Sequence, residues 1–428
     1  MNVPPLPAGT ALTPRGQGRG HYQVVDLVAA QSGEDPEDRG RGTFGFVYLA
    51  RRHPDRQLVA IKELAPDYLA TRSIDGVTII PFEGGADTFS QLRGHFFEEF
   101  ANAAAVRDPH AVAVLDVWSE NGTVYLAMEH IEGARCVDRS PAGDPVRYPW
   151  PLAAHVLLPI LQALRAAHAS GTCHFDIKPN NVLIDRAGRV VVIDFGAARS
   201  LEQLRRARGR LFCSPGYGPR ELERRDFLHY AGPWIDLYSW GMLALDVTIG
   251  HPTEDGLPLP ASERMVLASG YPSTVDPYTG TGARLLSAGF PSAWAIAIER
   301  CIHPLPQRRF ASVDQVWSHL GISVVEHAES ARRPYRWPPA PFDDVGLWRH
   351  FVAPPPEVEE EELPEAAEPT PASLSSPASR EARALGERAE EFRLAASLRR
   401  MMRRIRRMGM DGPETDLGAR PARTQRGS

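Results

Sequence analysis

The sequence CHFDIKPNN at residues 173–181 is followed, after two apolar runs and a glycine-containing turn, by DFG at residues 194–196. The apolar runs are rich in valine and isoleucine, and this pattern predicts a β-hairpin that brings Asn181 and Asp194 to neighbouring strand ends. A carboxylate and a carboxamide so placed can hold Mg²⁺, while another carboxylate, Asp176, can accept a proton from a hydroxyl group. The spacing therefore predicts a site for phosphate chemistry.

Either half of this pattern alone would more often be a turn than a site, because Asp, Asn and Gly are ordinary turn residues. The two halves together resemble the catalytic loop and the D-F-G motif of protein kinases. The resemblance implies that Asp176 accepts the hydroxyl proton, that Lys178 offsets charge on the transferred phosphoryl group, and that Asn181 and Asp194 hold Mg²⁺ or Mn²⁺. The chain departs from the family at Phe175, where an arginine usually reads a phosphorylated activation segment.

Composition sets broad limits on the function. The chain has 428 residues and a net charge of -5, which suits a two-lobed catalytic unit with appended segments and predicts no specific nucleic-acid partner. Its 4 cysteines are scattered without metal-binding or disulfide spacing, as expected of reduced thiols. The first 20 residues carry no apolar signal segment, and no apolar run reaches about 18 residues. We therefore expect a cytoplasmic protein.

The N-terminal region resembles the nucleotide-binding part of a kinase. Residues 1–20 are rich in proline and glycine and are expected to form a flexible leader. A G-x-G-x-x-G-x-V string then supplies Gly40, Gly42, Gly45 and Val47. It lies between two predicted strands rather than before a helix, which argues against a dinucleotide-binding fold and for a flap over nucleotide phosphates.

The sequence VAIK at residues 59–62 resembles the family's phosphate-contacting strand. On this resemblance Lys62 contacts the α- and β-phosphates of ATP, and Ala60 lies beside the nucleotide. The lysine's partner is expected to be a glutamate on a helix predicted at residues 95–106. Counting back from Asp108 selects Glu99, with Glu98 as the alternative.

Two further stretches complete the predicted small lobe. The connection at residues 63–94 is similar to that of one group of bacterial serine/threonine kinases, although a plain loop is the alternative. A strand pair then leads to Met128, Glu129 and His130, which resemble the hinge between kinase lobes. There the backbone of Glu129 and His130 would read the adenine edge, with Met128 as gatekeeper.

The activation segment of the predicted large lobe ends in SPGYGPRE at residues 214–221. It resembles the segment found in the same bacterial group, and Glu221 is expected to pair with Arg309. Asp236 is expected to bind the backbone of the catalytic loop. With Phe175 in place of the arginine, and Ser200 the only hydroxyl residue between positions 197 and 213, we predict activity that does not depend on Ser200.

The last hundred residues differ in composition. Residues 326–378 are Pro-rich and acidic and predict a disordered linker, and residues 411–428 a disordered tail. Between them, residues 379–410 combine an apolar seam with many arginines, which predicts a basic amphipathic helix. Its expected partner is an acidic protein surface, an anionic membrane or the chain's own glutamates at residues 357–362. A disordered basic tail is the alternative.

These observations predict an α+β, two-lobed protein kinase fold at residues 21–325, with a small lobe at about 21–128 and a large lobe at about 133–325. The expected reaction transfers the γ-phosphoryl group of ATP to Ser or Thr hydroxyls of protein substrates. A pseudokinase-like scaffold that binds nucleotide or partners without turnover is the alternative. A kinase of small molecules ranks third, because residues 214–221 resemble a protein-substrate segment.

Overall fold

The structure is a computed structural model that describes residues 3–14, 20–28, 41–42, 45–140, 143–195, 199–200, 214–223, 228, 230–268 and 276–322. The chain divides into two units, Met1–Pro356 and Glu357–Ser428. All elements given below belong to the first unit. The predicted linker, basic helix and C-terminal tail lie outside the described residues.

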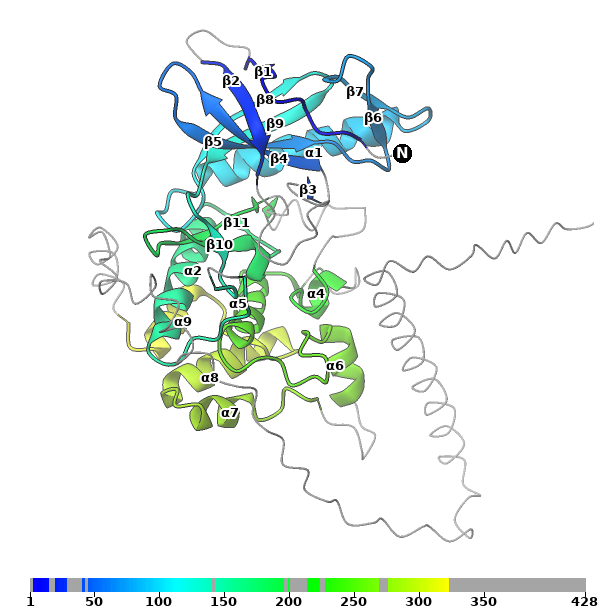
Figure 1. The fold of residues 1–428 in the computed structure, drawn as a ribbon. Helices are drawn as coiled ribbons and strands as arrows, with labels where there is room; N and C mark the ends of the chain where they lie inside the picture. Colours follow the sequence, from blue (N-terminus) through cyan, green and yellow to red (C-terminus); the bar gives the residue numbers. More distant parts are fainter. Residues whose placement is uncertain are drawn as a thin grey trace, which may run out of the picture. The chain divides into compact units, whose positions relative to one another are not determined.

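The small lobe is built on an antiparallel sheet with the strand order β1-β2-β4-β5-β9-β8, and β3 pairs with β4 (Figure 1). The strands are β1 (Ala11–Leu12), β2 (Tyr22–Leu27), β3 (Arg41–Gly42), β4 (Gly45–Arg52), β5 (Leu58–Leu64), β8 (Val114–Glu120) and β9 (Thr123–Glu129). Because side chains alternate along a strand, Lys62 and Glu63 of β5 lie on opposite faces of this sheet.

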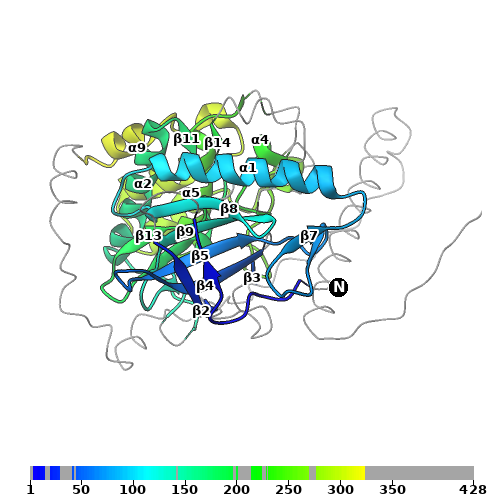
Figure 2. The same ribbon diagram turned by 90° about the horizontal axis from the view of Figure 1, so that it is seen from above.

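Helix α1 (Ala86–Ala105) lies alongside β8, as Figure 2 shows. It begins earlier than the sequence predicted. Phe89 and Phe96 are seven positions apart, so they share one face of the helix, and both are buried. Burial of Phe89 therefore accounts for the additional N-terminal turns.

The connection between β5 and α1 contains a hairpin rather than a plain loop. Strand β6 (Ala70–Arg72) pairs with β7 (Ile79–Pro81). The N-terminal residues also differ from expectation, since β1 pairs with β2. Val3, Leu6 and Leu12 are buried with the core of the small lobe. Residues 3–14 are therefore an ordered part of this lobe, and the prediction of a flexible leader was wrong for them.

The large lobe is mainly helical. Its helices are α2 (Leu152–Ala169), α4 (Arg220–Glu223), α5 (Trp234–Asp246), α6 (Ala261–Ala268), α7 (Thr281–Ser287), α8 (Ser292–Cys301) and α9 (Val313–His319). Helix α5 is buried over most of its length, and Trp240 at its centre donates its Nε1–H to the carbonyl oxygen of Leu157 at 3.1 Å. Helix α2 has the length and apolar character of a membrane span, but half of it is buried and it packs against α5 as a core helix.

Short strands flank the predicted site residues at positions 174–181 and 194. Strand β10 (Arg135–Cys136) pairs with β12 (Val182–Ile184), which pairs with β13 (Val190–Val192), and β11 (Thr172–Cys173) pairs with β14 (Arg199–Ser200). The β12–β13 pair is the predicted hairpin. Ile193 donates its backbone N–H to the carbonyl oxygen of Asn181 at 2.9 Å, so Asn181 and Asp194 do lie at neighbouring strand ends.

Candidate active site

The catalytic loop is fixed from below by a buried carboxylate. Asp236 of α5 is fully buried and accepts the backbone N–H groups of His174 and Phe175, both at 2.8 Å. Its Oδ2 also lies 2.8 Å from Nε2 of His168. Burial alone would raise the pKa of Asp236, but the interactions with His168 and His174 outweigh it and lower the pKa. The predicted anchoring role of Asp236 is confirmed.

The carboxylate of Asp176 is the centre of the site. Its Oδ2 accepts hydrogen bonds from Nζ of Lys178 at 2.8 Å and from Nδ2 of Asn181 at 2.9 Å. Its Oδ1 accepts the hydroxyl of Ser214 at 2.7 Å, and Lys178 also donates to this hydroxyl oxygen at 2.7 Å. One carboxylate therefore holds a lysine, an amide and a hydroxyl group from two separate segments.

A second ion pair joins the two lobes. Nζ of Lys62 lies 2.5 Å from Oδ1 of Asp194. Burial would raise the pKa of Asp194, but the positive charge and hydrogen bond of Lys62 outweigh this effect and lower the pKa. The side chains of Glu99 and Glu98 lie outside the described residues, so the predicted pairing of Lys62 with Glu99 stays a prediction.

The residues present fit a divalent cation. Asn181 directs its Nδ2 to the backbone oxygen of Asp176 at 2.8 Å and to the Asp176 carboxylate. Its amide oxygen is thus the atom left for a ligand, and Asp194 adds a carboxylate at the adjoining strand end. Carboxylate and amide oxygens are ligands that Mg²⁺ accepts. These two residues would hold the ion.

The glycine-rich strands lie directly against the lysine strand. Gly45 has a φ of 152° and a Cβ atom added there would stand 1.9 Å from the carbonyl oxygen of Glu63, so only glycine fits. Val47 is opposite Lys62 in the β4–β5 register, and Ala60 is opposite Met128 in the β5–β9 register.

Because paired positions share a face, Val47, Ala60, Lys62 and Met128 lie on one face of the sheet. The structure thus brings four predicted nucleotide contacts together. Gly42 pairs with Gly45, whereas Gly40 lies outside the described residues.

Comparison with known proteins agrees with this geometry. A model of the protein kinase domain matches residues 35–319, which is more than half of the chain. The chain belongs to the protein kinase family. Among the solved structures similar to this kinase is the apo form of PpkA-294, with a TM-score of 0.52 and 24% identity over 74% of this chain and 99% of that chain. At this identity the likeness shows the fold.

Curated relatives of this kinase include plant and bacterial proteins. It is 33% identical over 220 residues to CBL-interacting protein kinase 4 of Oryza sativa subsp. japonica, an alignment that covers 50% of this chain and 44% of the relative. It is 29% identical over 212 residues to a probable serine/threonine-protein kinase of Clostridium perfringens (strain 13 / Type A), covering 49% and 28% of the two chains. The alignments thus span less than half the length of these relatives.

The predicted hinge of the kinase is held by contacts of Glu129. The backbone N–H of Glu129 donates to the carbonyl oxygen of Ala113 at 2.9 Å, so this donor is not available to an adenine ring. The Glu129 side chain is also bound, to Arg189 at 3.2 Å and to the backbone N–H of Ala113 at 3.1 Å. His130 is half-buried, and burial lowers its pKa. The predicted contact of the Glu129 and His130 backbone with the adenine edge stays a prediction, and at Glu129 it would use the carbonyl oxygen.

The activation segment of the kinase is held at its C-terminal end. Arg309 and Glu221 form a buried bidentate ion pair at 2.8 and 3.1 Å, as predicted. Phe175 has a φ of 64°, a rare conformation for a bulky residue, and its side chain is buried in an apolar cluster with Leu222, Leu228 and Ile235. The residue that replaces the family's arginine thus lies in an apolar cluster with residues that follow the activation segment. Residues 201–213 lie outside the described residues.

The sequence did not reveal that the Ser214 hydroxyl bridges Asp176 and Lys178. Its position before a Pro-Gly pair served only as a mark of substrate type. A hydroxyl residue at the end of the activation segment was the available signal, but nothing in the spacing of residues 176 and 214 indicates contact.

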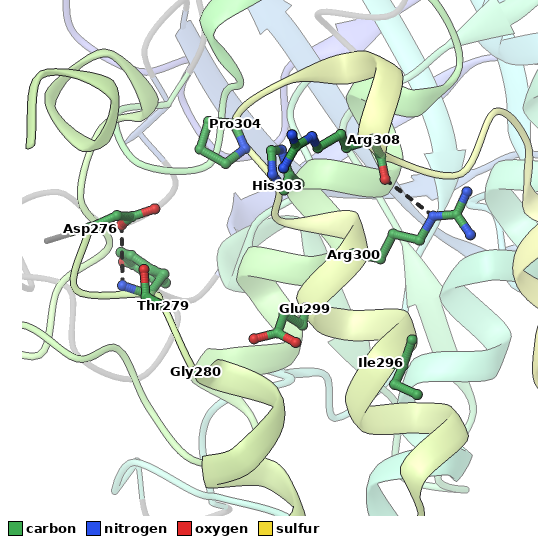
Figure 3. A pocket seen from close by; sticks show the side chains of 10 residues that line it. Asp276, Thr279, Gly280, Ile296, Glu299, Arg300, His303, Pro304 and Arg308 are labelled. Atoms are coloured by element: carbon green, nitrogen blue, oxygen red, sulfur yellow. Dashed lines mark hydrogen bonds between the residues drawn. The ribbon is translucent and has the colours of Figure 1, made fainter. Parts of the chain in front are cut away.

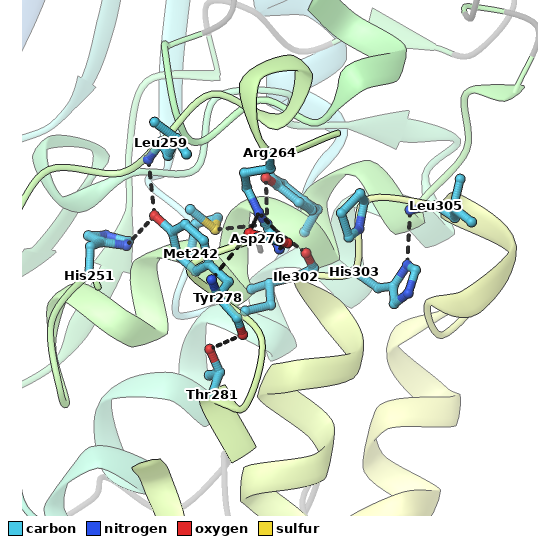
Figure 4. Close-up of polar contacts among 12 residues, drawn as sticks. Met242, His251, Leu259, Arg264, Asp276, Tyr278, Thr281, Ile302, His303 and Leu305 are labelled. Carbon is cyan, nitrogen blue, oxygen red and sulfur yellow. Dashed lines mark hydrogen bonds and ion pairs between the residues drawn. The ribbon is translucent and has the colours of Figure 1, made fainter. Parts of the chain in front are cut away.

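The large lobe has a second concave region, between residues 276–280, helix α8 and residues 303–308 (Figure 3). None of the predicted site residues lines it. Beneath it, buried Arg264 pairs with Asp276 at 2.9 Å and donates to Tyr238 at 3.1 Å and to the carbonyl oxygen of Ile302 at 2.8 Å (Figure 4). The buried positive charge is therefore fully compensated, and this region serves the scaffold of the lobe.

Proposed function

We propose that this kinase phosphorylates serine and threonine side chains of proteins with ATP. The observation that carries the proposal is the carboxylate of Asp176, which is bound at once by Lys178, Asn181 and Ser214. Such a carboxylate is held in one orientation, as an acceptor of a substrate proton must be.

The chemistry follows from these positions. The substrate hydroxyl oxygen forms a bond to the γ-phosphorus of ATP, while the bond from that phosphorus to the β,γ-bridging oxygen breaks. Asp176 accepts the hydroxyl proton, and the products are a phosphoester and ADP. Lys178 offsets the negative charge on the transferred group, and Lys62 exchanges its contact with Asp194 for the phosphates. Mg²⁺ held by Asn181 and Asp194 would neutralise phosphate charge.

The choice of serine and threonine over tyrosine rests on Lys178 and Ser214. Their contact at 2.7 Å places a short hydroxyl-bearing segment directly beside Asp176. The name of the relative from Clostridium perfringens, a probable serine/threonine-protein kinase, supports the same choice.

The competing function is a scaffold that binds nucleotide without turnover. It would need the same nucleotide-binding residues, but it would not need a carboxylate oriented by three donors. We therefore place the enzyme first. The two functions differ in what Asp176 does, since a scaffold has no proton to accept.

The test is transfer of labelled phosphate from Mg·ATP to peptides that contain Ser, Thr or Tyr as the only hydroxyl residue. We expect transfer to Ser and Thr peptides, and a fall of about 100-fold or more in Asp176→Asn. Asp314→Asn is the matched control, because Asp314 pairs with Arg165 on the surface of the large lobe. Calorimetric titration with Mg·ADP checks that both variants still bind nucleotide. Transfer that survives Asp176→Asn, or nucleotide binding without any transfer, would contradict the proposal.

A further inference from the structure

The N-terminal residues 3–14, called the strap below, make contacts that the kinase reaction described above does not use. Gly9 donates its backbone N–H to the carbonyl oxygen of Val24 at 2.8 Å, and Thr13 donates its own to Oε2 of Glu120 at 2.9 Å. Val3 and Leu12 are 2% and 0% exposed. The strap is therefore packed on the small lobe along most of its length.

The N-terminal part of the strap lies against a buried cluster of charged and tyrosine side chains. Glu63 and Arg72 form an ion pair at 2.7 Å, and neither side chain has any exposed surface. Tyr48 donates its hydroxyl to Oε2 of Glu63 at 2.7 Å, and Tyr125 donates to Oε1 at 3.0 Å. Burial raises the pKa of both tyrosines, so both remain neutral donors.

Two hydrogen bonds connect the strap to this cluster. The backbone N–H of Leu6 donates to the hydroxyl oxygen of Tyr48 at 2.9 Å. Nε of Arg72 donates to the carbonyl oxygen of Pro4 at 2.7 Å. The contacts close a ring that runs from Leu6 through Tyr48, Glu63 and Arg72 back to Pro4. Loss of the strap would remove the acceptor of the Arg72 Nε–H and the donor to the Tyr48 hydroxyl oxygen.

The cluster acts on the strand that carries the phosphate-binding lysine. Glu63 follows Lys62 directly on β5, and the two side chains point to opposite faces of the sheet. On the face toward Asp194, Lys62 has a long side chain whose reach depends on where its Cα lies. On the other side Glu63 is fixed by three neighbours and cannot shift without breaking buried hydrogen bonds. The position of Lys62 is thus set from the far side of its own strand.

We propose that the strap is a positioning element for Lys62 and acts through the Leu6, Tyr48, Glu63 and Arg72 contacts. This inference rests on the proposed function only where it concerns turnover, because positioning of Lys62 already affects nucleotide binding. Loss of the strap exposes Glu63 and Arg72 to water, so β5 gains freedom and Lys62 meets the phosphates less often. The dissociation constant for nucleotide then rises.

The test measures the Kd of Mg·ADP by calorimetric titration in the full chain and in a chain that lacks residues 1–14. We expect a rise of about tenfold in the shortened chain, the effect of one or two ordinary hydrogen bonds. The measurement is made well below the midpoint of thermal unfolding of each chain. A folded, shortened chain with an unchanged Kd and an unchanged KM for ATP would show that the strap only stabilises the lobe, and this would overturn the proposal.

Two matched substitutions separate the strap from the rest of the cluster. Tyr48→Phe and Tyr125→Phe each remove one hydroxyl that donates to Glu63, but only the hydroxyl of Tyr48 also accepts from the strap. We expect Tyr48→Phe to raise the Kd of Mg·ADP about threefold more than Tyr125→Phe in the full chain, and no more than Tyr125→Phe in the shortened chain. Equal effects of both substitutions in the full chain would overturn the proposal. This comparison uses the full chain alone, so it decides the proposal even if the shortened chain does not fold.

The same titration separates this inference from the proposed function. A full chain that binds Mg·ADP but transfers no phosphate would contradict the proposed reaction and leave the strap proposal to be decided by the Kd values. A full chain that binds no Mg·ADP would contradict both.

Discussion

Lys62 and Glu63 are neighbours on one strand, yet each pairs with an opposite charge in a different setting. The Lys62–Asp194 pair joins the two lobes, with side chains 11% and 37% exposed, whereas the Glu63–Arg72 pair is 0% exposed on both sides. The Lys62–Asp194 pair must separate when Lys62 contacts phosphates, and its partial exposure to water is consistent with this exchange. The buried pair has no such task and fixes the strand. One strand thus combines an exchangeable contact with a permanent one.

The largest effect is expected when the buried Glu63–Arg72 pair is broken. Arg72→Met removes the partner of a fully buried carboxylate and should lower the free energy of unfolding by about 3–5 kcal/mol. Urea denaturation measures the change. The double substitution Glu63→Met with Arg72→Met should recover part of this loss, because no unpaired charge then remains. A single variant as stable as the wild type would show that the pair contributes nothing.

The next largest effect is expected from removing Lys62 of the Lys62–Asp194 pair. Lys62→Met should lower kcat/KM for phosphoryl transfer by about 10²- to 10³-fold, because the lysine supplies charge where the phosphates lie. The urea midpoint should change little, since a pair in partial contact with water adds little stability. A large loss of stability with normal kcat/KM would reverse the assignment of the two pairs.

A smaller effect is expected at Ser214, whose hydroxyl lies between Asp176 and Lys178. Ser214→Ala should lower kcat about tenfold, because removal of one hydrogen bond leaves the Asp176 carboxylate less well oriented. Ser214→Thr retains the hydroxyl and is the matched control. If both variants behaved alike, the hydroxyl would have no part in orienting Asp176.

The free energy of unfolding should depend on acidic pH differently in the wild type and in Asp194→Asn, because only the wild-type side chain can ionise. The pKa of Asp194 lies below its ordinary value of 3.8 in the folded chain, so ionised Asp194 stabilises the fold above that pH. This contribution is lost as the pH falls through the lowered pKa. Urea denaturation of wild type and Asp194→Asn should show a constant stability difference above about pH 5 that shifts in favour of the variant below about pH 4. A difference independent of pH would contradict the lowered pKa.

The smallest effect is expected at Ser200. Its backbone belongs to β14, which pairs with β11 beside the catalytic loop, and Phe175 is buried in an apolar cluster with residues that follow the activation segment. No arginine stands at position 175 to read a phosphate, so kcat of Ser200→Ala should equal that of wild type. Phosphate analysis of the purified protein by mass spectrometry accompanies the assay. A requirement for phosphate at Ser200 would show that another cation reads it.

Sequence reasoning succeeded where a function is carried by contiguous residues. Asp176, Lys178 and Asn181 lie within one loop, and Asp194 is separated from them by a single hairpin, so spacing alone indicates proximity. The Glu221–Arg309 pair was expected only because the family resemblance connects two distant motifs. The two-lobed fold followed from the same motifs.

Sequence reasoning failed where contacts are distant and carry no motif. Glu63 and Arg72 look like charges for a solvated surface, because burial of both depends on a strap some 60 residues away. The strap is rich in proline, and Val3, Leu6 and Leu12 follow neither helical nor strand spacing. Its order comes from the sheet edge that β1 joins, which local propensity does not reveal.

The burial of Val3 has a practical consequence for anyone who prepares this protein. A purification tag fused ahead of residue 1 would join the chain within two residues of a side chain that is 2% exposed. Bulky or charged tag residues there would compete with the packing of the strap. Nucleotide binding would then weaken although the predicted nucleotide-binding residues are unchanged. We therefore expect a tag placed after Ser428 to give the lower KM for ATP, and inhibitor screens made with the two tagged proteins to disagree.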